Sequence, residues 1–391
     1  MSIGSRLHQI RQARGMSLED LSVAMGGAVT KQALSKYERD RAMPRPTVLV
    51  AMAKALGVKS AELIRIPELH IEPVAYRALK SMPKRERDRI ESRVTFELEH
   101  RLRLQDRLGR RPSLGVEPAS RKVSTIKDAE AAADSVRRDW SLGLDPIANL
   151  TDAIEEHGVH VVEVESDKKF DGLAVVARDE DGVVQAAAIA TRPDTSGQRQ
   201  RLNRAHELGH LALAVGDDVD PEKAAFRFAG ALLFPADALL REVGEKRGNI
   251  SPAELLALKR RWGMSAQALL FRMRDLEVIN QTTYTRWCVD ISRMGWRTQE
   301  PGDSPPERAT WLELSALRAA SEGLIAREEV AEYSPSLATA DSGASMSRRD
   351  LMRLPLADRR AILRQQAEAA AEDYNATIDH EWLDGDFSDV D

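Results

Sequence analysis

Two histidines and a glutamate in one short stretch of the chain have the types and spacing of a zinc hydrolase site. His206 and His210 stand four residues apart, and Glu207 directly follows the first histidine. Because residues four apart share one face of a helix, both imidazoles can bind one metal ion. Zinc lowers the pKa of water, and Glu207 is placed to act as the general base on that water. The alternative is a helix that carries two histidines by chance.

A zinc site of this kind needs a third protein ligand, because one position is kept open for water. Downstream, Pro221 starts a helical pattern and Glu222 falls in its first turn, where a carboxylate can face the His206 helix. The residues alone leave Asp220 and His157 open as substitutes. Glu222 could also serve only to complement the helix dipole.

The segments AHELGHLAL and EKAAFRFAGALLFP together resemble the ImmA/IrrE-type zinc peptidases, a metal-dependent family that cleaves repressor proteins. The resemblance covers roughly residues 140–245. In that family a glutamate thirteen residues before the proline of an ALLMP-like run is the third ligand, which implies Glu222 when counted back from Pro235. The chain departs from the family at Phe226, where Asn is usual, and at Phe234, where Met is common. The helix is expected to bury its apolar residues Phe226, Phe228, Leu232 and Leu233.

The elements that must position this motif can be read upstream of it. A helix is expected over PIANLTDAIEEHG, followed by strands over VHVVEVE, GLAVVAR and VVQAAAIATR. The acidic turn at residues 179–182 would join the last two strands as a hairpin. A small sheet therefore leads through the loop TRPDTSGQR into the helix of His206.

The first sixty-odd residues predict short helices with turns between them, with Ser5, Ser17 and Thr30 as N-caps. The pattern of RQARGMSLEDLS, TKQALSKYERDRAMP and MAKALGV resembles the phage-repressor-type (XRE) helix-turn-helix family. That resemblance implies a third helix whose N-terminal end enters the major groove of operator DNA. Asp40 stands where the family often has Gly, so the resemblance does not fix the conformation of the turn after the third helix. By position, the DNA-binding residues would be Lys31, Gln32, Ser35 and Lys36 for bases or phosphates, and Arg39 and Arg45 for the backbone.

This basic face also has a second interpretation, in which the module binds protein or only supports the rest of the chain. The open face carries Lys and Gln rather than acids, which favours DNA.

Two further helical segments leave their roles open. Residues 83–108 predict the longest helix, with an apolar stripe that either packs on a neighbouring domain or forms a dimer seam; the stripe is Ile90, Val94, Leu98 and Leu102. Residues 250–279 predict two amphipathic helices around a turn at Gly263, with Ser251 and Ser265 as N-caps. This second helix-turn-helix-shaped module either recognises a protein substrate or packs as filler.

The end of the chain has a different composition. A flexible linker is expected over SPSLATADSGASMS, and LPLADRRAILRQQAE followed by WLDGDF is weakly similar to short antitoxin segments. A solvated helix with a disordered tail is the alternative. The last twenty residues are acidic, with no Lys or Arg. Because the tail would stay tethered near the core, its His380, Glu381, Asp384 and Asp386 could cover an open zinc position. The same acidity could instead dock on the basic helix at residues 83–108 or remain solvated.

Composition limits the class of protein. The net charge of −5 hides a basic front and an acidic tail, which suit a polyanion and a basic partner respectively. Cys288 is the only cysteine, so an intrachain disulfide is excluded and a reducing compartment is expected. The N-terminus has no signal-peptide pattern, and no apolar run reaches the roughly eighteen residues that a membrane span needs. A cytoplasmic protein without membrane partners is expected.

Together these patterns predict an α+β, mostly helical regulator: a five-helix helix-turn-helix domain, a zinc peptidase core with a small sheet, a helical winged-helix-like module and an acidic tail. The expected function is a DNA-binding transcriptional regulator whose zinc metalloendopeptidase (HExxH, gluzincin-like) domain cleaves a partner repressor or antitoxin. The alternatives are a non-catalytic transcription factor and an antitoxin that neutralises a toxin by binding. A homodimer is a further expectation. The predicted domains are the helix-turn-helix at 1–68, a basic linker helix at 69–120, the peptidase core at 121–245, a helix-turn-helix-like module at 246–335, and a flexible linker with the acidic antitoxin-like segment at 336–391.

Overall fold

The computed structural model divides the chain into two compact units, Met1–Ser334 and Pro335–Asp391. The described residues are 2–65, 69–74, 82–109, 114–166 and 170–333 in the first unit, and 355–356, 358–361, 363–364 and 367 in the second. The described residues of the antitoxin-like segment are largely exposed. All of them except Pro355 are helical. The expected linker and the acidic tail, with its His380 and Glu381, lie outside the described residues.

The N-terminal domain has the five helices that its sequence predicts. Their shared core contains Leu7, Leu21 and Leu34, each essentially inaccessible to solvent. Ser17 and Thr30 cap their helices as expected, whereas the expected cap at Ser5 is wrong: Ser2 is the N-cap, and Ser5 completes the capping box with it. The helices are α1 (Ile3–Ala13), α2 (Leu18–Ala24), α3 (Lys31–Glu38), α4 (Pro46–Leu56) and α5 (Ser60–Ile64).

The conformation of Asp40 shows why aspartate can stand where the helix-turn-helix family often has glycine. Its backbone has φ 54°, the left-handed conformation that favours glycine and that aspartate tolerates better than most residues. Its carboxylate accepts a hydrogen bond from the Gly4 backbone N–H at 3.0 Å and another from the Ser2 hydroxyl. Asp40 therefore makes the turn and also fastens it to the start of α1.

A four-stranded sheet forms the centre of the following region. Its order is β1-β4-β5-β3, with β4 and β5 paired antiparallel as the predicted hairpin and β3 parallel to β5. β1 pairs antiparallel with β4 at the other edge. The strands are β1 (His70–Pro73), β3 (Val159–Glu163), β4 (Gly172–Arg178) and β5 (Val184–Thr191).

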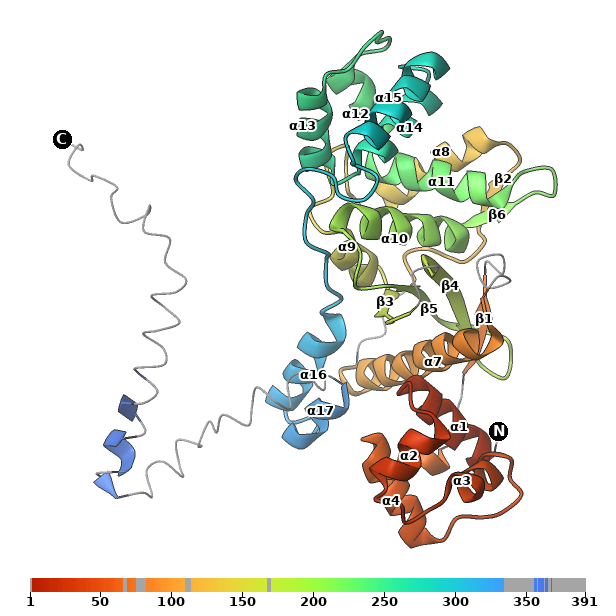
Figure 1. Ribbon diagram of the computed structural model, residues 1–391, viewed down its shortest axis with the longest axis vertical. Coiled ribbons are helices and arrows are strands. Elements are labelled where there is room, and N and C mark those ends of the chain that lie inside the picture. The colour runs from red at the N-terminus through yellow and green to blue at the C-terminus, as the bar shows by residue number, and fades with distance from the viewer. Residues whose placement is uncertain are drawn as a thin grey trace. The chain divides into compact units, whose positions relative to one another are not determined.

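Both faces of this sheet are apolar and covered by helices. Along β4, Leu173 and Val175 pack into one cluster, whereas the alternate residues Ala174 and Val176 pack into another, as the period of two in a strand requires. Helix α7 (Lys84–Arg107) covers the first face, and α10 (Gly197–Ala212) lies on the second (Figure 1). The predicted stripe on α7 is buried against the sheet, which confirms the linker-helix interpretation over the dimer seam.

Most of the remaining helices extend the second cluster. The two helices after residue 250 share this core, and Ser251 and Ser265 cap them as predicted. No helix among the described residues has the length and hydropathy that would let it cross a membrane. The elements are β2 (Arg121–Val123), α8 (Ile126–Asp139), α9 (Leu150–Glu156), β6 (Leu213–Val215), α11 (Pro221–Leu233), α12 (Ala236–Val243), α13 (Pro252–Trp262), α14 (Ala266–Asp275), α15 (Gln281–Arg293), α16 (Trp311–Ser321), η1 (Arg327–Glu329) and α17 (Val330–Tyr333).

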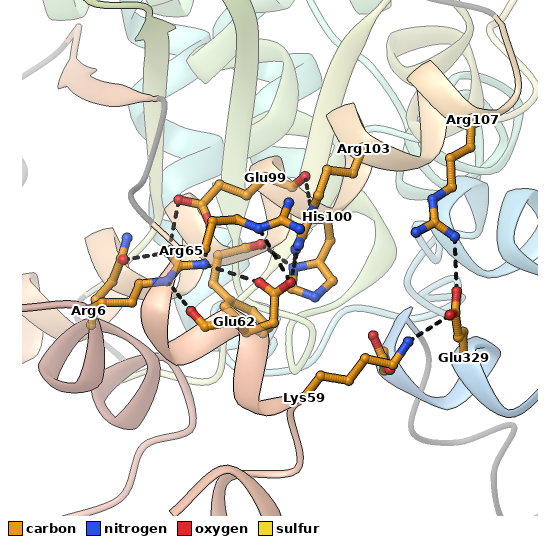
Figure 2. Close-up of polar contacts among 12 residues, drawn as sticks. Arg6, Lys59, Glu62, Arg65, Glu99, His100, Arg103, Arg107 and Glu329 are labelled. Carbon is orange, nitrogen blue, oxygen red and sulfur yellow. Dashed lines mark hydrogen bonds and ion pairs between the residues drawn. The ribbon is translucent and has the colours of Figure 1, made fainter. Parts of the chain in front are cut away.

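Ion pairs connect the helix-turn-helix domain to α7 (Figure 2). Arg6 of α1 is buried and lies 2.7 Å from Glu99 of α7 and 3.3 Å from Glu62 of α5. Arg103 of α7 also pairs with Glu62. At the rim, Glu329 contacts Lys59 at 2.7 Å and Arg107 at 3.0 Å. The domain is therefore fixed to α7 mainly through the buried groups Arg6, Glu62 and Glu99, with exposed ion pairs at the rim.

His100 lies inside the same interface and predicts a loss of stability in acid. It is 4% exposed, and its Nδ1 donates to the Phe96 carbonyl at 2.7 Å. Burial, and next the Arg103 guanidinium, lower the pKa of His100 to about 3. An unfolded histidine has a pKa of about 6.5, so unfolding takes up a proton between these values and stability falls as the pH falls. At pH 5 we expect His100 to lower the free energy of unfolding by about 2 kcal/mol.

The measurement is urea unfolding at pH 7 and pH 5 for the parent protein and for His100→Phe, which cannot titrate. The exposed His70, replaced in the same way, is the control and should keep the parent's pH dependence. An identical pH dependence in His100→Phe would contradict the prediction.

Candidate metal centre

Helices α10 and α11 bring the predicted metal ligands together. Contacts pair His210 with Glu222 and His206 with Phe226, so the two helices run antiparallel. Gly209 lies at their closest approach, because a Cβ there would stand 3.1 Å from the Phe228 ring and 3.2 Å from the α11 backbone. The glycine of the HELGH sequence therefore lets α11 come close enough for Glu222 to reach both histidines.

The three side chains form a compact cluster of possible ligand atoms. Within it, one donor atom from each of His206, His210 and Glu222 lies within 4.8 Å of the others. The two Nε2 atoms are 3.0 Å apart, and the Glu222 carboxylate oxygens lie 3.3 Å from His206 Nε2 and 3.5 Å from His210 Nε2. Both histidines are 8% exposed, whereas the Glu222 side chain is 35% exposed, so the cluster opens to solvent on the side of Glu222.

This donor set suits zinc. Two imidazole nitrogens and one carboxylate oxygen are a ligand set of catalytic zinc sites, which keep a further position open. Nε2 of His206 faces the cluster, while its Nδ1 is buried and has no hydrogen-bond partner among the described residues. The residues present therefore fit a zinc ion with three protein ligands.

The two substitutes for the third ligand are placed elsewhere. Asp220 is the N-cap of α11, and its carboxylate accepts from the Glu222 backbone N–H at 3.0 Å. His157 stacks on Trp140 with ring centroids 4.4 Å apart. Neither residue belongs to the cluster, which leaves Glu222 as the carboxylate beside the two histidines.

Glu207 packs against strand β4 and interacts electrostatically with His206 and Glu222. It is 5% exposed, and burial raises the pKa of its carboxyl to about 7. Its close approach depends on Gly172, where a Cβ would stand 2.7 Å from the Glu207 carboxylate. Burial also lowers the pKa of His210 to about 4, with the neighbouring His206 as the second cause. The Glu207 carboxyl group is thus buried between α10 and β4.

One expected core residue is instead part of the site. Phe226 is 47% exposed, and its ring lies 4.1 Å from the His206 ring. The physical reason is position: Phe226 follows Glu222 by four residues, so it shares the helix face that looks toward the cluster. Phe228, Leu232 and Leu233 are fully buried, as expected.

Several buried arginines that hold α10 in place were not anticipated. Arg204 is inaccessible to solvent and contacts Thr151 and Glu163. Arg201 pairs with Glu307, which ties the loop before α16 to α10. Charged residues on a helix normally indicate a solvated face, so the sequence carried no signal for this role.

The predicted DNA-binding residues lie on the helix-turn-helix domain, away from its core. Leu34 is the buried anchor of α3, and the opposite side of that helix is open. Lys31 is 3.6 Å from Glu19, and both side chains are well exposed. Ser35 is half-buried; the exposed members of the set are Lys31, Gln32, Lys36, Arg39 and Arg45.

Fold and site together define a class: a helix-turn-helix domain joined to an α+β domain that carries a His–His–Glu cluster. Residues 7–63 match the family model described as Helix-turn-helix. Residues 154–274 match the peptidase family model described as IrrE N-terminal-like domain. The chain therefore joins an XRE-type helix-turn-helix, a DNA-binding type of domain, to an IrrE/ImmA-like domain of a metallopeptidase family. No curated protein matches the chain. The second match begins at residue 154, within the expected range of roughly 140–245, and extends past the end of that range to include α13 and most of α14.

Proposed function

We propose that this protein is a DNA-binding transcriptional regulator whose second domain is a zinc-dependent endopeptidase. Its substrate would be a partner repressor or antitoxin, and cleavage would relieve repression. The observation that carries the proposal is the convergence of His206, His210 and Glu222, with the buried Glu207 close enough to interact electrostatically with His206 and Glu222. The peptidase family match supports the same reaction class.

Different residues of the chain would have different roles in peptide hydrolysis. His206, His210 and Glu222 would hold the zinc ion. When bound, zinc supplies a Lewis acid that polarises a peptide carbonyl and acidifies water. Glu207 would take the proton of the attacking water and pass it to the leaving amine. Phe226 covers one face of His206 and so limits the freedom of that imidazole.

Metal analysis tests the site directly. The purified protein should bind about one zinc ion per chain, the stoichiometry of a site with three protein ligands and one open position. Glu222→Ala should lose most of the metal, because only two imidazoles remain. Asp220→Asn is the matched control: it keeps an N-cap side chain and should keep the zinc. Full occupancy in Glu222→Ala would move the third ligand to another residue and contradict the assignment.

The DNA-binding half of the proposal makes a separate prediction. If α3 reads a major groove, Gln32→Ala should lower specificity for the operator more than affinity for unrelated duplex DNA. Lys36→Ala should weaken binding to all sequences and reduce the salt slope by about one. Fluorescence anisotropy with the promoter of the protein's own operon, at several salt concentrations, measures both effects. Undetectable binding at low salt would favour the protein-binding interpretation of this module.

A further inference from the structure

A cavity of about 420 Å³ opens beside the metal cluster and has no place in the function described so far. Its walls come from α10, α11, α14 and α15, so it lies where the helices after residue 250 pack on the peptidase core. Its volume falls in the range of roughly 300–1,000 Å³ that is usual for ligand sites. The apolar members of the lining include Leu202, Phe226, Met264, Ala268, Phe271 and Tyr284.

The antiparallel pairing of α10 and α11 places this cavity one helical turn from the histidines. His206 faces Phe226, so the next turn of each helix sets Leu202 near Gly230, and both line the cavity. Phe226 is the shared wall, since its ring touches His206 and also borders the cavity. Gly230 lets the Arg272 side chain pack close to α11, because a Cβ there would stand 3.2 Å from Arg272 Cδ.

The charged groups at the edge of the cavity are occupied by one another. Arg227 lies 2.5 Å from Asp275 and also pairs with Glu130, and Glu130 in turn pairs with Arg272. At the outer rim, the Arg274 guanidinium lies over the rings of Phe271 and Tyr284, at 4.2 Å and 4.7 Å. The lining cations Arg227 and Arg272 are matched by the carboxylates of Asp275 and Glu130, whereas Arg274 is an additional cation that lies over the aromatic rings. The walls between these groups are therefore mainly apolar.

We propose that this cavity receives a large apolar side chain, of leucine or aromatic size, from the substrate residue next to the cleaved bond. This inference rests on the proposed peptidase function and names its substrate class: peptides with such a residue beside the scissile bond. Its distance of one turn from His206 suits a side chain that branches from a backbone held at the metal cluster. Helices α14 and α15 then act as specificity walls, which gives the helical module after residue 250 a part in substrate recognition.

Zinc-binding probes test the cavity without requiring turnover. Three succinyl hydroxamates that differ only in a methyl, isobutyl or benzyl side chain are titrated calorimetrically into the zinc-loaded protein. The larger two should bind about ten- to a hundredfold more tightly than the methyl compound, because their apolar side chains are transferred from water into the cavity. Equal affinities of all three compounds would overturn the proposal while leaving the metal site intact.

Filling the cavity supplies the second arm. Ala268→Phe should reduce the spread among the three compounds to about threefold or less, with the methyl compound unaffected, and Ala268→Leu should act in the same direction by a smaller factor. Ala257→Phe, on the exposed side of α13, is the matched control and should keep the full spread. Zinc content and the melting midpoint show that each variant is folded.

An unchanged spread in both folded Ala268 variants would refute the assignment of the cavity. The absence of zinc-dependent binding by every compound, including the methyl one, would refute the metal site of the proposed function and this inference with it.

Discussion

Glu207→Gln is expected to keep about one zinc ion per chain and to lower hydrolysis of the natural partner by about 10²–10⁴-fold. The substituted side chain has the same shape and still fits against Gly172, so the cluster of His206, His210 and Glu222 should be undisturbed. Glutamine cannot accept the proton that leaves the attacking water. The expected loss is therefore in the rate of the chemical step rather than in metal binding.

The measurement is co-expression of the parent and variant proteins with the products of neighbouring genes, followed by mass spectrometry of the fragments. Zinc content is measured on the same samples. Asp220→Asn should cleave like the parent, because Asp220 lies outside the cluster. Equal cleavage by Glu207→Gln would remove Glu207 from the role of base. A parent protein that leaves every candidate intact would favour the alternatives, a non-catalytic transcription factor or an antitoxin that acts by binding.

The metal cluster was largely readable from the sequence because it depends on local geometry. His206 and His210 share a helix face by their spacing alone, and that face requires no knowledge of the rest of the fold. Glu222 was different: it comes from a second helix, and its distance from the histidines depends on the close packing at Gly209. Only the resemblance to a known family selected it over Asp220.

Position on a helix, rather than residue type, decided the case that the sequence misjudged. Phe226 and Phe228 are both apolar residues of α11, but Phe228 faces the core and Phe226 faces the metal cluster. The predicted ligand Glu222, four residues earlier, was the available signal, since it indicates which face of the helix looks toward the site. The cavity beside it could not be foreseen, because its walls come from two helix pairs, α10 with α11 and α14 with α15, that are separated in the sequence.

Short and charged features were the other limit. Strands β2 and β6 have three residues each, too few for an alternating pattern to show, and they form a parallel pair by tertiary contact alone. Helix α8 was not predicted, although its sequence did carry a signal for a helix start, the capping box of Thr125 with Asp128. The buried Arg204 had none, because its partners Thr151 and Glu163 come from separate elements.

Removing the Arg6 side chain is expected to cost about 3–5 kcal/mol in the attachment of the helix-turn-helix domain. Arg6 is 1% exposed, donates to the Glu62 carbonyl at 3.1 Å and pairs with Glu99 at 2.7 Å. Arg6→Met keeps most of the apolar volume but leaves the buried Glu99 carboxylate without its cation. Burial already raises the pKa of Glu99, which shows how little water that carboxyl group meets.

Hydrogen exchange of peptides from α1 and from α10, followed separately, measures this attachment without assuming that the whole chain unfolds at once. Arg6→Met should speed exchange in α1 and leave α10 unchanged. Adding Glu99→Met should restore most of the protection, because an apolar pair can replace a buried ion pair and Glu62 keeps Arg103 as its partner. The exposed Arg41, replaced by Met, is the control. If α1 exchanges equally fast in Arg6→Met and Arg41→Met, the buried ion pairs do not hold the DNA-binding domain on α7.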